Sequence, residues 1–416
     1  MICYTIAMKF YKREIYLNKI RGFYNDTDII KVITGVRRCG KSCLMATIAE
    51  ELQLKGVSDS QIVYLDLDRR PYRSVKTPGS LEKLIDNNTH NSGITYIFID
   101  EIQNVKGFEE VINSFREEGR YSIFITGSNS YLLSGELITK LTGRYLEFEM
   151  FPLTFDEYIA MKAFHGKSIS QDITEEFDTY LREGGFPKAI QYDSTEDRRT
   201  YIKGIVTEIF EKDIKRRVKI RHLSIFQKVQ TYLINNFGAT TSISNILEAL
   251  KKDGTIIKRE TLYRYIEILK DAKILYECNR FDLKSRASIN GEQKYYLSDL
   301  GFYFATNTDT RINYGPVLEN TIFSYARAHG YSTSIGRVGK LECDFILRRN
   351  DSEYSYVQSC MTMATSLETE NREYAPLIKI RDNYPKYILT RNDPIQKRDG
   401  IIHKNLPQFM SHGELF

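Results

Sequence analysis

The chain has 416 residues, of which 42% are hydrophobic and 27% charged, as in a soluble globular protein of two to four domains. Its formal net charge of +5 gives no general attraction to nucleic acid, so any such contact must be local. No apolar run approaches the ~18 residues of a membrane span, and the six cysteines and six histidines show no metal-binding or disulfide spacing. We therefore expect a cytoplasmic protein with reduced thiols, no zinc and no membrane contact.

The first residues, MICYTIAMKFYKREIY, place a short apolar stretch before the basic residues, which is the reverse of a signal peptide. We therefore do not expect these residues to act as a signal peptide. The periodic sequence begins near Met8, so both Met1 and Met8 stay open as the start of translation.

A strand, a glycine-containing loop and a helix follow one another early in the chain. The run DIIKVIT (28–34) predicts a buried strand, and SCLMATIAEELQLKG (42–56) predicts a helix that ends at Gly56. The residues between them fit the pattern G-x-x-x-x-G-K-[ST]. They are Gly35, Val36, Arg37, Arg38, Cys39, Gly40, Lys41 and Ser42, with Cys43 next in the helix.

This arrangement predicts a cradle for nucleotide phosphates. The glycines let backbone N–H groups turn inward, and the helix N-terminus adds the positive end of its dipole. Lys41 would reach the β- and γ-phosphates, and Ser42 would be a ligand of Mg²⁺. The alternative is a glycine-rich turn with an exposed lysine.

Four further apolar runs alternate with helical stretches. The strands are expected at 61–68, 94–103, 121–130 and 144–150, and the helices at 79–89, 107–118 and 131–142. Alternation of this kind predicts a mostly parallel sheet that is covered by helices on both faces. Ligands bind such a sheet at the carboxyl ends of its strands, where we expect Lys41, Asp100 and Asn129 to converge.

The polar residues after the third and fourth strands have distinct expected roles. Asp100 follows four apolar residues and would hold Mg²⁺, usually through water. Glu101 would orient and polarise an attacking water, and Asn129 would contact both that water and the γ-phosphate. The alternative for Asp100 and Glu101 is a solvated strand end.

Several motifs resemble one family over nearly the whole chain. They are GVRRCGKS, YIFIDEIQ, ITGSNS, LTGRYLEFEMFPLTFDEY, YLREGGFPKAI and LECDFILRRNDSEYSYVQSCM. Together they resemble an AAA-like, archaeal-type P-loop ATPase related to the STAND class, coupled to a C-terminal restriction-endonuclease-like domain. The resemblance implies that Arg144 is an arginine finger and that Pro187 packs near adenine in a lid. The alternatives are a surface arginine paired with Glu147 or Glu149, and a plain helix C-cap.

The predicted fold class is α/β, with four parts in chain order. A P-loop ATPase core (1–151) is followed by a helical lid (152–220), a winged-helix domain (221–305) and an α/β restriction-endonuclease-like domain (306–416). A dense basic stretch, Lys212–Arg221, ends the lid and is either a nucleic-acid contact or a solvated connector. Its bases are Lys212, Lys215, Arg216, Arg217, Lys219 and Arg221.

The third helix of the winged-helix part is expected to bury Leu262, Ile266 and Leu269. Its opposite face carries three acids and one base: Glu260, Arg264, Glu267 and Asp271. A duplex would be repelled by that face, so we expect a packing or partner-binding role. Lys258 and Arg259 at its start leave a phosphate contact open.

In the last part, Glu319 and Asp344 stand where nucleases of the resembled fold carry their first two acids. Gln358-Ser359-Cys360 stands in place of Glu-x-Lys, so we expect the fold without nuclease activity. Lys340 or Lys379 would substitute for the missing lysine if the fold brought one near. Ordinary surface charge is the alternative for Glu319 and Asp344.

Three functions follow. The first is an ATP-binding, Mg²⁺-dependent ATPase that acts as a switch or remodeller on an unknown protein partner, as a homo-oligomer if Arg144 acts in trans. The second is an ATP-gated DNA nuclease of a mobile-element or defence type. The third is a scaffold that binds ATP without hydrolysing it.

Overall fold

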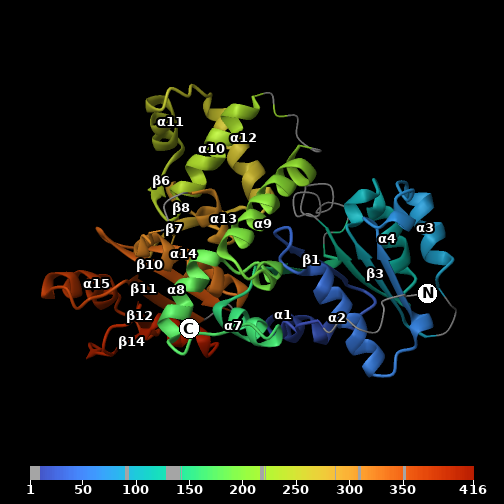
Figure 1. Ribbon diagram of the computed structural model, residues 1–416, viewed down its shortest axis with the longest axis horizontal. Helices are drawn as coiled ribbons and strands as arrows, with labels where there is room; N and C mark the ends of the chain where they lie inside the picture. The colour runs from blue at the N-terminus through green and yellow to red at the C-terminus, as the bar shows by residue number, and fades with distance from the viewer. Residues whose placement is uncertain are drawn as a thin grey trace. The chain divides into compact units, whose positions relative to one another are not determined.

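The computed structural model describes residues 10–89, 93–127, 141, 143–215, 220, 222–285, 287–307, 311–349 and 353–416 (Figure 1). The chain divides into two compact units, Met1–Met150 and Phe151–Phe416. This division falls at the predicted end of the first domain. Among the described residues, no helix has both the length and the apolar character needed to span a bilayer.

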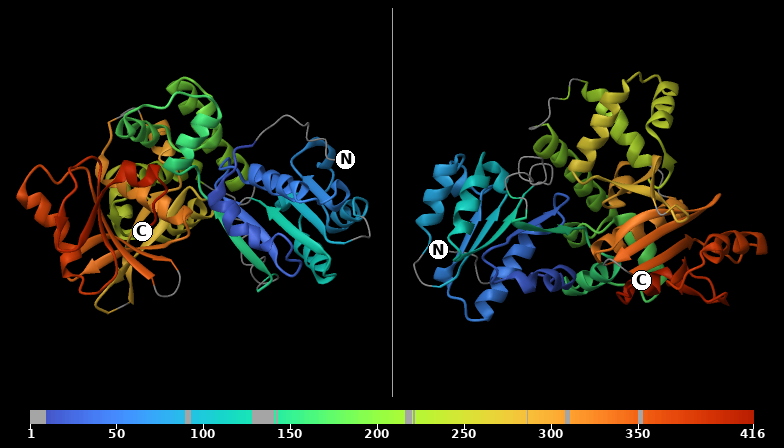
Figure 2. Two further views of the ribbon diagram at one scale, coloured as in Figure 1. Left: turned by 90° about the horizontal axis from the view of Figure 1, so that it is seen from below. Right: turned by 180° about the vertical axis from the view of Figure 1, so that it is seen from behind.

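The first unit is built on a five-stranded parallel sheet, which confirms the predicted fold class (Figures 1 and 2). The strands lie in the order β2-β3-β4-β1-β5. They are β1 (Ile30–Gly35), β2 (Ile62–Asp66), β3 (Thr95–Asp100), β4 (Tyr121–Thr126) and β5 (Tyr145–Met150). The helices are α1 (Glu14–Ile20), α2 (Lys41–Leu54), α3 (Pro78–Asp86) and α4 (Phe108–Glu117). The expected helix at 131–142 lies almost entirely outside the described residues.

The core of this unit follows the alternation of apolar residues along the strands. Ile30 and Val32 of β1 pack with Leu81 of α3 and Ile112 of α4 on one face, while α2 contacts β1 and β4 from the other. Because all five strands run in one direction, their carboxyl ends meet at one edge of the sheet. We call this the carboxyl edge.

A charged residue interrupts the apolar run of β1. The Lys31 side chain is fully buried, and its Nζ donates to the backbone oxygen of Asp26 at 2.6 Å and to Ser122 Oγ at 2.8 Å. The ammonium also lies 4.6 Å from the centroid of the Phe124 ring. Burial lowers the pKa of Lys31 to about 7, because loss of water disfavours the charged amine more than the nearby charge of Asp26 favours it.

Replacement of Lys31 by methionine should change how stability depends on pH. Between about pH 7 and pH 10 the unfolded wild-type chain keeps a proton that the folded chain has released, so its free energy of unfolding rises with pH. The variant lacks this rise. The stability of Lys31→Met relative to wild type should therefore be greatest at pH 7 and fall by roughly 2–3 kcal/mol toward pH 10. Denaturant unfolding at both pH values measures the difference, and an unchanged difference would contradict the prediction.

The second unit begins with helices. They are α7 (Phe155–Phe164), α8 (Ile173–Glu183) and α9 (Thr195–Glu208), with a 3₁₀ turn at Pro187–Gln191 and a π-helical turn at Ile209–Ile214. The next elements are α10 (Leu223–Asn235), β6 (Thr240–Thr241), α11 (Ile243–Lys252), α12 (Arg259–Asp271), β7 (Leu275–Asp282), β8 (Ala287–Leu297) and α13 (Gly301–Thr306). Leu262, Ile266 and Leu269 of α12 are buried.

The rest of this unit consists of further strands, which share one sheet with β6–β8, and of the helices that accompany them. They are α14 (Tyr314–Ala328), β9 (Ser332–Val338), β10 (Leu341–Arg349), β11 (Glu353–Cys360), α15 (Leu367–Lys379), β12 (Lys386–Thr390), β13 (Lys397–Arg398), β14 (Ile401–Asn405) and α16 (Leu406–Ser411). The nine strands lie in the order β13-β14-β12-β11-β10-β9-β7-β8-β6. Parallel pairing of β7 with β9 carries the sheet across the predicted boundary at 305/306.

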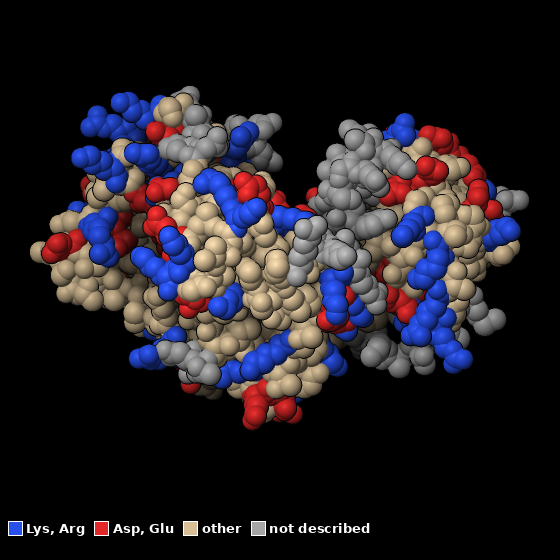
Figure 3. Space-filling view, turned by 90° about the horizontal axis from the view of Figure 1, so that it is seen from above, with Lys and Arg blue, Asp and Glu red and all other residues tan. Residues whose placement is uncertain are grey.

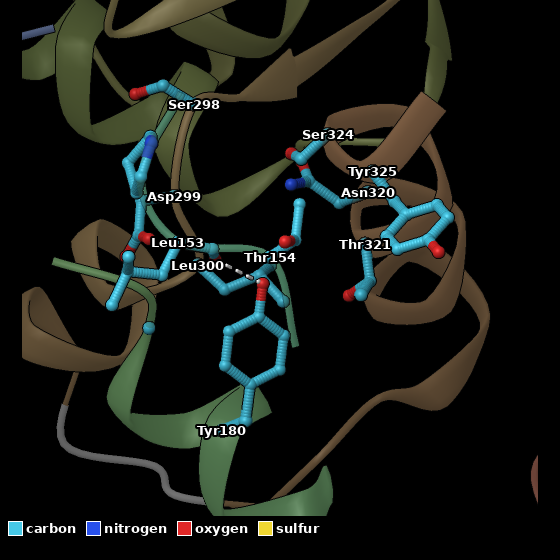
Figure 4. A pocket seen from close by; sticks show the side chains of 12 residues that line it. Leu153, Thr154, Tyr180, Ser298, Asp299, Leu300, Asn320, Thr321, Ser324 and Tyr325 are labelled. Atoms are coloured by element: carbon cyan, nitrogen blue, oxygen red, sulfur yellow. Dashed lines mark hydrogen bonds between the residues drawn. The ribbon is translucent and has the colours of Figure 1, made fainter. Parts of the chain in front are cut away.

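A buried carboxylate ties the helices of this unit to the sheet. Asp299 Oδ2 accepts from the backbone N–H of Gly185, and its Oδ1 accepts from that of Gly301, both at 2.7 Å. A Cβ at Gly184 would overlap Asp299 Oδ1, and Gly184 has φ +73°, so glycine is required there. Figure 4 shows Asp299 beside the small pocket that this contact borders, where Tyr180 Oη donates to the Leu153 backbone oxygen at 2.9 Å.

A second tie links α8 with the end of β12. Arg391 donates from Nε and Nη2 to the two carboxylate oxygens of Asp178, at 3.0 and 2.6 Å. Such a bidentate, partly buried pair fixes the orientation of both side chains. The segment around α8 and the sheet are therefore joined at two places within the second unit.

Candidate nucleotide-binding site

The loop between β1 and α2 has the backbone of a phosphate cradle. Gly35 and Gly40 have φ values of +139° and +111°, and Arg38 has +70°. A Cβ at Gly35 would overlap the backbone oxygen of Met150, so this position admits glycine only. Helix α2 begins at Lys41, which leaves Ser42 exposed in its first turn, where backbone N–H groups have no helical partner.

The Lys41 side chain bends back over this loop. Its Nζ donates to the backbone oxygens of Gly35 at 2.9 Å and Val36 at 3.2 Å, and the residue is only 7% exposed. Both partners are neutral carbonyls. The negatively charged oxygens of a nucleotide phosphate would be stronger acceptors for the same ammonium.

Residues from three elements meet at the carboxyl edge. Asp100, at the end of β3, is 3% exposed and accepts a hydrogen bond from Thr126 Oγ1 on β4. The hydroxyl of Ser42 on α2 is near enough to lower the pKa of this carboxyl. The sheet order places β4 between β3 and β1, so Thr126 bridges the two strands that carry the polar groups. The structure thus brings Ser42 close to Asp100, as the parallel sheet predicts.

Burial of Asp100 has an electrostatic consequence. The pKa of this carboxyl is raised to about 6. Desolvation is the largest cause and the neighbouring charge of Glu101 adds to it, while the side chains of Ser42 and Thr126 oppose the shift. A divalent cation beside Asp100 would favour the ionised form and relieve this penalty.

Mg²⁺-dependent nucleotide binding should therefore weaken in acid. Mg²⁺ needs the ionised carboxylate, and below about pH 6 the proton competes for it, so the apparent affinity should fall by up to about tenfold per pH unit. Mg²⁺ titrations of nucleotide binding between pH 5 and pH 7.5 measure the dependence. Asp100→Asn is the control, since its profile reports only the titration of the nucleotide itself, and identical profiles for both proteins would contradict the prediction.

Glu101 adopts an uncommon backbone conformation. Its φ and ψ of 56° and 46° are left-handed, which few non-glycine residues adopt outside functional sites. The backbone N–H of Glu101 donates to Thr126 Oγ1 at 3.3 Å, and the Gln103 side-chain amide donates to the Glu101 carboxylate. This turn carries the carboxylate out of the strand and holds it partly exposed at the carboxyl edge.

Two contacts at the site were missed in the sequence. Thr126 is the last residue of β4 and holds both acids, and a polar residue ending an apolar strand was the available signal. Arg13, just before α1, donates from Nη1 to the backbone oxygen of Cys39 at 3.1 Å and supports the loop from outside. No local pattern distinguishes Arg13 from the other early basic residues.

The structure does not bring Arg144 to the site of its own chain. Arg144 precedes β5, and its backbone oxygen accepts from Ile30 N at the start of β1. The loop follows the other end of β1, about 17 Å of strand away. Arg144 Nη1 donates to Asn113 Oδ1 at 3.1 Å and lies 4.0 Å from Glu117, rather than pairing with Glu147 or Glu149.

The roles expected of two other residues stay predictions. Asn129 lies outside the described residues. Pro187 begins the 3₁₀ turn of the second unit, so its contact with adenine stays a prediction.

In the basic stretch, Lys212 pairs with Glu208 at 2.8 Å and Lys215 with Glu211 at 3.0 Å, which leaves their charges partly neutralised. Residues 216–219 and 221 lie outside the described residues.

The acids predicted in the last part do gather, around a lysine that the sequence did not single out. Lys294 Nζ, from β8, lies 2.8 Å from Glu319 Oε2 and 2.9 Å from Glu342 Oε1. Burial alone would lower the pKa of Lys294, but Glu319, Asp344 and Glu342 outweigh it and raise it. Lys340 and Lys379, the expected substitutes, are exposed.

Asp344 is held by the residues that replace Glu-x-Lys. Its Oδ2 accepts from Ser359 N at 2.8 Å and Ser359 Oγ at 2.9 Å, and its Oδ1 accepts from Gln358 Nε2 at 3.1 Å. Burial and the charge of Glu319 raise the pKa of Asp344, against the effect of Lys294. Among the described residues, no group of three or more metal-ligating side chains is arranged to hold a metal ion.

Comparison with known proteins places this site in a family. Residues 27–159 match the family profile described as "AAA domain", and residues 174–311 match a domain of unknown function (DUF8612). An uncharacterized protein of Haemophilus influenzae is 33% identical over 382 residues, which cover 91% of this chain and 92% of that protein. The chain belongs to this family of AAA-domain proteins. An uncharacterized protein of Methanocaldococcus jannaschii is 31% identical over 381 residues, which cover 88% of this chain and 82% of that protein.

A solved structure supports the fold of the AAA-domain family. A Walker-type ATPase of Pyrococcus abyssi matches with a TM-score of 0.51 and 16% identity, over 71% of this chain and 95% of that chain. AAA-type P-loop ATPases bind nucleotide and typically Mg²⁺. The residues present fit both groups. The ammonium of Lys41 donates to two neutral carbonyl oxygens, and the Ser42 hydroxyl and the Asp100 carboxylate, the donor types that Mg²⁺ takes, lie close together.

Proposed function

We propose that the chain is a Mg²⁺-dependent ATPase that acts as a nucleotide-controlled switch or remodeller, with the second unit as the part that responds. One observation carries the proposal: Ser42, next to the phosphate-binding lysine, lies close enough to Asp100, at the end of another strand, for its hydroxyl to lower the pKa of that carboxyl. These residues are 58 positions apart in the chain, and a solvated strand end gives no reason for their closeness.

Each residue at the carboxyl edge has a task in this proposal. Lys41 would leave the carbonyls of Gly35 and Val36 and bind phosphate oxygens. Ser42 and Asp100 would hold Mg²⁺, which when bound neutralises charge on the phosphates. Glu101 would orient and deprotonate water, and Gln103 and Thr126 would keep its carboxylate in position.

Phosphate release from the purified chain tests the proposal. We expect turnover of ATP that requires Mg²⁺ and stops when the metal is chelated. Tight ATP binding without turnover, with or without DNA, would instead support the scaffold. Absence of both binding and turnover would overturn the assignment to nucleotide chemistry.

A role for Arg144 at a γ-phosphate would require a second copy of the chain. In its own sheet Arg144 lies at the amino ends of the strands, and the carboxyl edge is at their other ends. Turnover per chain should then rise with protein concentration and lose this rise in Arg144→Ala. A rate per chain that is independent of concentration would remove Arg144 from the proposed mechanism.

A nuclease activity is less well supported. We propose that the second unit keeps a restriction-endonuclease-like core, since α14, the antiparallel β9–β11, α15 and β12 parallel to β11 follow one another. Lys294 already supplies a positive charge between Glu319 and Glu342. DNA incubated with the chain, ATP and Mg²⁺ or Mn²⁺ should stay intact, and cleavage that is lost in Asp344→Ala would establish the nuclease instead.

A further inference from the structure

A cluster of exposed bases lies at the turn between α11 and α12. Lys251 and Lys252 end α11, and Lys258, Arg259 and Arg264 belong to the start of α12 and the residue before it. All five are exposed, and none forms an ion pair with another residue of the described ranges. We call these five residues the α11–α12 surface.

Acidic residues reduce the positive charge of this surface less than the sequence suggests. Between 251 and 264 the acids are Asp253, which lies 3.9 Å from Lys228, and Glu260. Glu267 lies in the second half of α12 and is bound by Lys270 at 2.8 Å, which also pairs with Glu277. Of the acids that were expected to repel a duplex, Glu267 is therefore partly neutralised and Asp271 ends the helix, whereas Glu260 lies in the first turn of α12 beside Arg259.

Exposed side chains of another kind accompany the bases. Tyr263, one position before Arg264, is 57% exposed, and Ile256 in the turn is 84% exposed. Tyrosine hydroxyls commonly donate to phosphate oxygens of a nucleic acid. Figure 3 shows the side on which α11 and α12 lie in Figure 1: Lys and Arg side chains gather at its upper left, and elsewhere on this face acidic and basic side chains are interspersed.

The elements around the surface suit a double helix. Helix α12 is the third of three helices, and β7 and β8 follow it as a hairpin whose outer strand pairs with β6. In helix-turn-helix proteins the N-terminal part of the corresponding helix enters the major groove. The major groove of B-DNA admits a helix, whereas that of A-form RNA is too narrow for side chains to read.

We propose that the α11–α12 surface binds the phosphate backbone of double-stranded DNA. This goes beyond the proposed ATPase function and does not depend on it, because the surface is separate in sequence from the carboxyl edge. We expect binding that is largely independent of the nucleotide sequence. The surface offers lysine and arginine side chains for the phosphates and one exposed aromatic side chain.

Fluorescence anisotropy of a labelled duplex of about 20 base pairs tests the proposal. The full chain is titrated without nucleotide at several salt concentrations, so a failed ATPase assay leaves this result interpretable. Five phosphate contacts predict a slope of log K against log [salt] of roughly −3 to −4.5. Arg259→Glu with Arg264→Glu should weaken binding at least about tenfold and reduce the slope by about 2.

A matched control reverses the charge of two exposed lysines elsewhere in the same unit. Lys379→Glu with Lys397→Glu makes the same change in net charge near the other edge of the nine-stranded sheet, and should change the affinity less than about twofold. Arg259→Gln with Arg264→Gln repeats the test if the charge reversal disturbs folding. Equal weakening by the control, no weakening by either Arg259/Arg264 variant, or tighter binding of single-stranded DNA or duplex RNA would overturn the proposal.

Discussion

Lys41→Ala should weaken the binding of ATP by about 10- to 100-fold or more. Hydrogen bonds between an ammonium and phosphate oxygens contribute about 1.5–3 kcal/mol, and each 1.4 kcal/mol is tenfold in affinity. The Nζ of Lys41 is already at the loop, bonded to the oxygens of Gly35 and Val36, so little side-chain freedom is lost on binding. Titration with a fluorescent ATP analogue measures the change.

Lys55→Ala is the matched control for this experiment, because Lys55 is exposed at the far end of the same helix. It should bind the analogue as the wild type does. Circular dichroism on both variants separates loss of binding from loss of fold, because Lys41 is buried. Unchanged affinity of a folded Lys41→Ala would remove the loop from the nucleotide site.

Glu101→Gln should bind ATP but hydrolyse it about 10²–10⁴ times more slowly. The substitution keeps the shape of the side chain and removes the carboxylate that would accept a proton from water, a contribution of this size for general bases. The carboxylate that the substitution removes is held by Gln103, and the backbone of Glu101 is held by Thr126. Single-turnover phosphate release, with binding measured in parallel, separates the two effects.

Glu82→Gln, the same change on the exposed side of α3, should leave turnover unaffected. A Glu101→Gln variant that hydrolyses ATP at the wild-type rate would assign the base to another residue. A variant that fails to bind would instead give Glu101 a structural role.

The nucleotide-binding edge was predictable because its rules are local. Apolar runs mark the strands, glycines mark the loop, and parallel strands bring their ends to one edge. The same rule sends Arg144, which precedes a strand, to the opposite edge, so its position in the fold followed from the sequence although its role was taken from the resemblance.

Other features depend on contacts between distant segments. Lys294 reaches Glu319 because α14 packs against β8, and no sequence spacing predicts that contact. The charge of the α12 face likewise depended on the pairing of Lys270 with Glu267 and Glu277, the latter on a different element. Side-chain pairing of this kind is set by packing rather than by helical periodicity.

Amide hydrogen exchange with and without a non-hydrolysable ATP analogue and Mg²⁺ tests the central claim most directly. If one triphosphate is bound by groups from separate strands, exchange should slow together in the loop at 35–43 and at the end of β3 around Asp100 and Glu101. Both effects should be lost in Lys41→Ala. Slowed exchange in only one of these segments, or in neither, would contradict a single site at the carboxyl edge.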